Sequence, residues 1–231
     1  MRATTEQQPY IFLESSKREI LKLIAIVTML ADHIGIVVFE NEPVFRIIGR
    51  ISFPLFAMLL AEGFIRTKHP RQYATRLFVF FLISQIPFMA ALQYTGYLNI
   101  FLDLLVGFLL LWLLKTDRTI LFGLLLFTVA IFPSVSGYSL NYGWYWLLVI
   151  VLAYLYFTKR LKAIPTYALF VVITCLLVVT KNANFIQLFT VLSPLVAYAV
   201  LQSNLAMKRM PKYLYYAFYP AHLILLWFFF R

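Results

Sequence analysis

Ionisable side chains that lie inside long apolar runs are the first candidates for catalysis or binding in this sequence. Asp32 and His33 are adjacent in the first apolar run, Arg46 and Arg50 are four residues apart in the second, and His222 lies in the last. A charged side chain in the hydrocarbon of a membrane costs at least about 2.5 kcal/mol, so each of these residues is a hypothesis for a functional site. Because an imidazole titrates near neutral pH, either histidine could accept or donate a proton.

Helix geometry predicts how these residues lie relative to one another. Adjacent positions on a helix point about 100° apart, so Asp32 and His33 are not expected to pair with each other. The short hairpin between the first two apolar runs makes them antiparallel, which predicts an Asp32–Arg50 ion pair that holds His33 in position. The alternatives are that Asp32 is only a structural partner and that His222 bridges helices, relays a proton or binds an acceptor. The catalytic candidates are His33, Asp32, Arg50 and His222.

A basic cluster lies at the other end of the second apolar run. Glu62 and Arg66 are spaced i,i+4 and share a helix face, and more cations follow in the next connection. Planar arginine forks suit phosphate oxygens, which favours entry of an anionic, phosphate-bearing donor at this point. The alternative is an ordinary basic loop that binds anionic lipid. The candidates for donor binding are Lys22, Glu62, Arg66, Arg71, Tyr73 and Arg76.

Other polar residues could face an acceptor. Tyr219 is spaced i,i+3 from His222, and Asn99 and Asp103 are spaced i,i+4 in the fourth apolar run. The intramembrane histidines and carboxylates lack the spacing of a zinc motif, so no metal site is expected. The single cysteine, Cys175, is expected to be a small buried hydrophobe. The candidates for acceptor binding are Arg46, Asn99, Asp103, Tyr216 and Tyr219.

The composition indicates which elements position these residues. Hydrophobic residues make up 63% of the chain and charged residues 13%, about half of the roughly 25% that is usual for soluble domains. The net charge of +11 would suggest nucleic acid in a soluble protein, but here the cations fall in short loops between apolar runs. Orientation in a membrane is the better interpretation, and nucleic acid is not expected as a partner. We therefore predict an all-α, polytopic membrane helical bundle.

Apolar runs of bilayer-spanning length predict about nine transmembrane helices. If the N-terminus lies in the cytoplasm and the C-terminus outside, 16 of the 20 lysines and arginines are cytoplasmic, all but Arg46, Arg50, Lys181 and Arg231. The polar residues 1–19 form a cytoplasmic segment without the pattern of a signal peptide, and 20–231 form a single transmembrane domain. The spans are predicted at residues 20–39, 45–65, 73–92, 98–114, 119–135, 142–157, 161–179, 183–201 and 213–230.

Several stretches together resemble the TraX family of membrane proteins, named for the pilin N-acetylase of conjugative systems. The resemblance is carried by residues 22–35, 46–56, 62–64, 73–77, 98–101 and 216–223. It implies a bacterial cytoplasmic membrane protein, within a broader group of transmembrane acyltransferases that take acyl groups from acyl-CoA in the cytoplasm and modify acceptors on the other side. It also implies that His33 is the catalytic histidine and gives functional weight to Asp32, Arg50 and His222.

The first functional hypothesis is transfer of an acetyl or other short acyl group from acetyl-CoA to an amine or hydroxyl acceptor at the outer face. In this hypothesis His33 is a general base, or alternatively carries the acyl group as a covalent intermediate, and Arg50 or His222 stabilises the oxyanion. The acceptor would be a protein N-terminus or a glycan, and membrane lipids are the other partners. A proton-coupled transporter that uses His33, Asp32 and His222 as a relay is an alternative, and the lack of an evident inverted repeat counts against it. A non-catalytic assembly factor for a surface structure is a third hypothesis.

Overall fold

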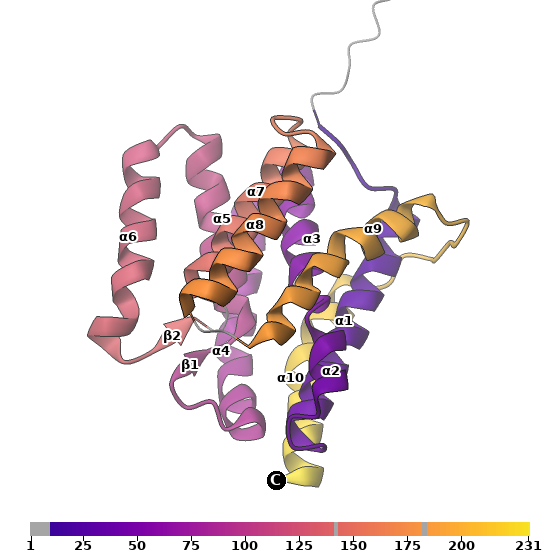
Figure 1. Cartoon of the computed structure of the whole chain (residues 1–231), viewed down its shortest axis with the longest axis vertical. Coiled ribbons are helices and arrows are strands. Elements are labelled where there is room, and N and C mark those ends of the chain that lie inside the picture. The colour runs from indigo at the N-terminus through magenta and orange to yellow at the C-terminus, as the bar shows by residue number, and fades with distance from the viewer. Residues whose placement is uncertain (1–9, 141–142, 182–183) are drawn as a thin grey trace, which may run out of the picture.

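The computed structural model describes residues 10–140, 143–181 and 184–231, and it is mostly helical, as predicted (Figure 1). Residues 1–9 of the predicted N-terminal segment, and positions 142 and 183 at which two predicted spans begin, lie outside the described residues. The helices are α1 (Ser15–Val37), α2 (Pro43–Gly49), α3 (Ser52–Arg66), α4 (Pro70–Leu92), α5 (Ile100–Lys115), α6 (Thr119–Ser136), α7 (Gly143–Phe157), α8 (Ala163–Lys181), the 3-10 helix η1 (Phe185–Val191), α9 (Leu192–Gln202) and α10 (Lys212–Phe230).

Each predicted span coincides with a helical segment, but the segments differ in length. In the described chain, six are long and apolar enough to cross a membrane. The apolar stretches Tyr145–Phe157 of α7 and Ala163–Val179 of α8 are shorter, as is α5 with 16 residues. The count of nine spans and the N-in, C-out orientation therefore stay predictions. The six segments are α1, residues Pro43–Arg66, α4, α6, residues Phe185–Gln202 and α10.

Two predicted spans are internally divided. The second consists of α2 and α3, separated at Arg50 and Ile51, and the eighth consists of η1 followed by α9. Two short strands, β1 (Tyr97–Leu98) and β2 (Ser139–Leu140), pair in parallel beside the start of α5. Sequence periodicity gave no sign of them, because a two-residue strand is too short to show alternation.

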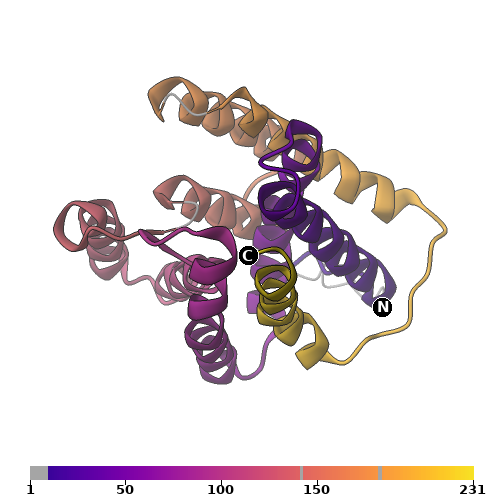
Figure 2. The same cartoon turned by 90° about the horizontal axis from the view of Figure 1, so that it is seen from below.

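The core lies between α1, α3, α4, α5, α7 and α10. Helix α1 packs on α2 and α3, α3 packs on α7, and α10 packs on α4. Close approach needs glycine at two crossings, since a β-carbon on Gly35 would lie 2.4 Å from that of Phe45, and one on Gly107 would lie 2.4 Å from Cδ1 of Ile150. Helix α6 stands at one edge of the bundle, as Figures 1 and 2 show, and contributes no buried residue.

Helix α8 corrects one expectation. Cys175 is exposed on this helix and is not the buried small hydrophobe that the sequence suggested. An apolar run predicts a helix but not which of its faces turns inward, because an outer face in contact with lipid is as apolar as an inner one.

The loop between α9 and α10, residues 203–211, passes round the outside of the bundle beside the N-terminal part of α1 (Figure 2). The ammonium of Lys17 donates hydrogen bonds to the carbonyl oxygens of Ser203 and Leu205, and the amide of Met207 donates to the hydroxyl of Ser16 at 2.9 Å. These bonds bring the start of α10 next to the start of α1. We call this end of the molecule, which also holds the α3–α4 connection, the basic end.

Candidate functional site

The two predicted histidines lie against each other, one from α1 and one from α10. Nδ1 of His33 is 2.7 Å from Nε2 of His222, and the rings are stacked with their centroids 5.0 Å apart. Nδ1 of His222 is 2.8 Å from the carbonyl oxygen of Phe218 one turn earlier in α10. His33 is 6% exposed and His222 5%, so the pair is almost completely removed from the surface.

This chain of contacts fixes which nitrogens carry hydrogen. A carbonyl oxygen can only accept, so Nδ1–H of His222 donates to Phe218, and a neutral His222 has Nε2 left as an acceptor. Nδ1–H of His33 therefore donates to His222. The lone pair of His33 then lies on Nε2, for which no hydrogen bond is recorded within the described chain. A neutral imidazole held in this way presents a basic nitrogen.

Asp32 lies in an ion cluster with the second span, as predicted. Its Oδ1 accepts from Nη2 of Arg50 at 2.9 Å, and its Oδ2 accepts from Nη1 of Arg46 at 2.8 Å. Arg50 also donates to the carbonyl oxygen of Arg46 and to the side chain of Gln187 in η1. The predicted Asp32–Arg50 pair is thus confirmed, and Arg46 joins it. The cluster braces α1 against α2 next to His33.

A cavity of about 340 Å³ extends between α1, α3, α4, α5 and α10 from the basic end towards the histidine pair. We call it the basic cavity. The cations that line it lie on α1, α3 and α4, on the start of α10 and on the loop before α10. Among the predicted donor and acceptor residues, those that line it are Lys22, Glu62, Arg66, Tyr73, Arg76, Tyr216 and Tyr219.

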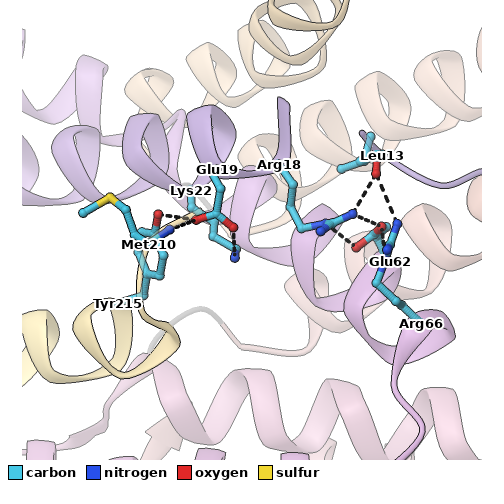
Figure 3. Close-up of polar contacts among 8 residues, drawn as sticks. All are labelled: Leu13, Arg18, Glu19, Lys22, Glu62, Arg66, Met210 and Tyr215. Atoms are coloured by element: carbon cyan, nitrogen blue, oxygen red, sulfur yellow. Dashed lines mark hydrogen bonds and ion pairs between the residues drawn. The ribbon is translucent and has the colours of Figure 1, made fainter. Parts of the chain in front are cut away.

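Two buried carboxylates hold the cations of this cavity in place (Figure 3). Glu62 accepts from Nε of Arg18 and Nε of Arg66, both at 3.0 Å, and the two arginines also donate to the carbonyl oxygen of Leu13. Glu62 is completely buried in the wall of the cavity, where it orients the two guanidinium groups.

The second carboxylate is Glu19. It accepts from Nζ of Lys22 at 2.8 Å and from the hydroxyl of Tyr215 at 2.6 Å, as Figure 3 shows. The amide of Met210 also points to it, at 3.4 Å. Glu19 thereby ties α1 to the start of α10 and sets the position of Lys22.

Arg76 provides a test of whether an anionic ligand fits here. Its Nε is fully buried, and among the described residues no hydrogen-bond partner is recorded for it. The guanidinium lies over the ring of Tyr73 and next to the hydroxyl of Tyr216, and all three residues line the cavity. A buried donor without a partner costs about 1–3 kcal/mol, and a phosphate or carbonyl oxygen in the cavity would remove that cost. The cations of the lining therefore suit an anionic ligand.

Met29 and Tyr219 are the lining residues of the basic cavity that lie nearest in sequence to the two histidines. The ring of Tyr219 lies edge-on to both imidazoles, with centroids 6.0 Å from His33 and 5.6 Å from His222. From Arg18 to Met29 the cavity follows α1 for about 16 Å, and His33 lies one turn further on. Tyr219 thus forms the wall between the cavity and the histidine pair.

Some predicted residues lie elsewhere. Arg71 is exposed and does not line the cavity. Asn99 is completely buried and caps α5: its side-chain oxygen accepts from the amide of Phe101, and its amide group donates to the side chain of Gln85. Asp103 is also buried and does not line the cavity. Arg46 belongs to the Asp32 cluster.

Sequence reasoning missed several residues of the basic cavity. Lys22 was selected as a donor candidate, but Arg18, spaced i,i+4 from it, was interpreted only as membrane orientation, and Glu19 between them was not considered. No local pattern could place the loop before α10 at the cavity, because hydrogen bonds to α1 put it there. The missed residues of the cavity and its supports are Arg18, Glu19, Arg209, Lys212 and Tyr215.

Comparison with known proteins gives partial matches to curated relatives. "Protein TraX" from Escherichia coli is 32% identical over 91 residues, which are 39% of this chain and 37% of that protein. "Probable fimbrial assembly protein FimC, serogroup H1" from Dichelobacter nodosus is 33% identical over 69 residues, 28% of each chain. "Uncharacterized protein RP591" from Rickettsia prowazekii (strain Madrid E) is 32% identical over 73 residues, 32% of this chain and 27% of that protein.

The matched segments therefore cover little more than a third of each relative at most. No solved structure matches the chain. The family described as TraX protein, in contrast, matches residues 17–229, which include both histidines, the Asp32 cluster and the lining of the basic cavity. The chain belongs to the TraX family.

Proposed function

We propose that this chain is a membrane acyltransferase that moves an acetyl or other short acyl group from acyl-CoA to an amine or hydroxyl acceptor. The observation that carries the proposal is the histidine pair. Its hydrogen bonds leave the lone pair of Nε2 of His33 free, one helical turn beyond Met29 in the lining of a cavity that has cations at its other end. We place the protein in the bacterial cytoplasmic membrane, with its basic end in the cytoplasm.

The basic cavity is the site for the donor. Cations held by Glu62 and Glu19 would bind the phosphates of CoA, and the buried Nε of Arg76 would donate to an oxygen of the donor. The pantetheine arm would extend along α1 towards Met29 and Tyr219. Displacement of the Tyr219 ring would bring the thioester to His33.

The reaction follows from the basicity of Nε2. As the acceptor nitrogen or oxygen attacks the thioester carbonyl carbon, His33 takes the proton that the acceptor loses. The new N–C or O–C bond forms, the C–S bond breaks, and the proton passes from His33 to the departing CoA thiolate. The imidazolium that forms in between is stabilised by its Nδ1–H···Nε2 bond to His222. Asp32 and Arg50 would act as positioning residues, because they neutralise each other and hold α1 at this depth.

The acceptor would approach from the end of the bundle opposite the basic end. A protein N-terminus fits the requirement for an amine, and a surface-filament subunit is the class suggested by the fimbrial assembly protein among the relatives. A glycan hydroxyl would meet the same chemistry.

The test uses the full chain in liposomes with acetyl-labelled CoA on the side of the basic end. The acceptor probe is a short peptide with a free N-terminus, and the same peptide with a blocked N-terminus and no hydroxyl side chain is the control. We expect label in the free peptide only, and a His33→Ala variant that transfers label at the wild-type rate would overturn the assignment.

A non-catalytic assembly factor is the second candidate, favoured by the printed name of the relative from Dichelobacter nodosus. It predicts that a folded His33→Ala variant supports assembly of the surface structure as well as the wild type does. The acyltransferase predicts that assembly or modification fails with this variant although the protein is still present in the membrane.

Proton-coupled transport is the third candidate function. A proton flux across the membrane of the same liposomes, driven by a pH gradient, would reveal it.

A further inference from the structure

A second cavity, which we call the lateral groove, lies between α3, α7, α8 and α9. It has a volume of about 360 Å³ and shares no lining residue with the basic cavity. Three of its lining residues are exposed on the outer surface of the bundle: Ile164 is 84% exposed, Tyr198 63% and Leu195 51%. Since Tyr198 and Leu195 belong to a segment long and apolar enough to span a membrane, the groove opens to the hydrocarbon of the bilayer.

Three of the five hydroxyl groups among the lining residues of the lateral groove donate within the protein. The hydroxyl of Ser193 donates to the carbonyl oxygen of Thr190 at 2.8 Å, and that of Thr166 donates to the carbonyl oxygen of Lys162 at 2.8 Å. The hydroxyl of Tyr167 points to the carbonyl oxygen of Val191 at 3.4 Å. Because these hydroxyl protons are directed back to the protein, the groove offers a hydrocarbon surface, which suits an acyl chain better than a polar ligand.

One end of the groove is positively charged. The lining includes Tyr156 before the α7–α8 connection and Ala163 after it, and the chain between them carries Lys159, Arg160 and Lys162, all exposed, without a carboxylate. The groove then follows α7 from Tyr156 to Val149, about 10 Å along the helix. Cations that flank one end of an apolar groove complement the phosphate of an anionic phospholipid, and the groove itself complements an acyl chain.

We propose that the lateral groove is a binding site for one anionic phospholipid, with its phosphate at the α7–α8 connection and an acyl chain between α3, α7 and α9. This site does not depend on the proposed acyl transfer. A bound lipid would fill the space between α9 and the rest of the bundle, where the described side chains leave the groove open.

The test is native mass spectrometry of the purified full chain titrated with phosphatidylglycerol or with phosphatidylcholine of the same acyl chains. We expect the first bound lipid to be phosphatidylglycerol by at least several-fold over phosphatidylcholine. The variant Arg160→Gln/Lys162→Gln should lose this preference. The matched control, Lys115→Gln/Arg118→Gln, should keep it. This variant removes the cation at the end of α5 and one in the α5–α6 connection, at the same end of the helices but outside the groove.

The acyl chain is tested separately. Ala153 lines the groove, and Ala153→Phe should reduce retention of both lipids by filling it. In case this variant fails to fold, a phosphatidylglycerol with a photoreactive acyl chain should crosslink the wild type at α3, α7 or α9. The proposal is overturned by equal binding of the two lipids, by loss of preference in the α5–α6 control, or by crosslinks confined to other helices.

Two other outcomes would also overturn it. Competition by glycerol phosphate alone would show that the site binds a headgroup but no acyl chain. If the protein were found as a dimer without bound lipid, the groove would be a contact between two copies of the chain, and this result would also overturn the proposal.

Discussion

His33 and His222 are 189 positions apart in the sequence, yet Nδ1 of the first lies 2.7 Å from Nε2 of the second. The contact exists only when the first and last helices pack against each other, and it decides the role of each ring. His222 accepts a hydrogen bond and is itself oriented by Phe218, so His33 is the residue that keeps a basic nitrogen.

The first prediction separates the roles of the two rings. His33→Gln should lower kcat for acyl transfer by about 10²- to 10⁴-fold, because it removes the general base. His222→Phe should have a smaller effect, since it removes only the acceptor that orients His33. Transfer from labelled acetyl-CoA by each variant in liposomes measures this. His69, which is exposed in the α3–α4 connection, provides the control His69→Gln, expected to be unchanged. A larger loss from His222→Phe than from His33→Gln would assign the base to His222.

The second prediction concerns the Asp32 cluster. Asp32→Asn should destabilise the protein by about 3–5 kcal/mol, because Arg50, only 8% exposed, is left without its counter-charge. Arg46→Gln should cost less, because its side chain is 20% exposed and Arg50 still pairs with Asp32. Unfolding in detergent measures both. Asp117→Asn, at an exposed position, is the control and should leave stability unchanged. Equal stability of the Asp32 and Asp117 variants would contradict the structural role.

The third prediction tests the crossing of α1 and α2. A β-carbon at Gly49 would lie 2.2 Å from Oδ1 of Asp32 and 2.3 Å from its Cβ. Gly49→Ala should therefore push the two helices apart, break the pairs with Asp32 and lower stability. Gly123→Ala makes the same change on α6, where nothing lies within 4 Å. Because alanine is the better helix former by up to about 1 kcal/mol, that variant should be neutral or more stable. The difference in unfolding midpoint between the two variants is the measurement.

The fourth prediction concerns the donor. Arg76→Gln removes a cation from the lining of the basic cavity, together with its buried and unpartnered Nε, and should raise KM for acetyl-CoA by about 10- to 100-fold, the value of a hydrogen bond to a charged group. Its effect on kcat should be smaller, since Arg76 is near the basic end and far from His33 along the bundle. The matched control is Arg118→Gln, an exposed arginine on the α5–α6 connection that does not line the cavity. An unchanged KM in Arg76→Gln would place the donor elsewhere.

Much of the candidate site was visible in the sequence because ionisable residues are rare in apolar spans. His33, Asp32, Arg50 and His222 could be selected for that reason alone, and the antiparallel hairpin was enough to pair Asp32 with Arg50. The cations of the basic cavity were harder to select. At the ends of spans, lysine and arginine are common for reasons of membrane orientation, so their presence did not distinguish the cavity-lining Arg76 from Arg71 outside it.

Length, hydropathy and charge are local properties of the chain, so they were enough to predict that it is helical and apolar enough for a membrane. They also predicted where its spans approximately lie and which ionisable residues are buried within them. The contact of His33 with His222, and the position of Tyr219 between the basic cavity and these two rings, came from the tertiary structure alone. The tertiary structure also decided that Asn99 caps a helix and that Glu62 orients two arginines. These contacts depend on which faces of distant helices meet. In a helix that is apolar on all sides, no local periodicity marks the face that packs against another helix.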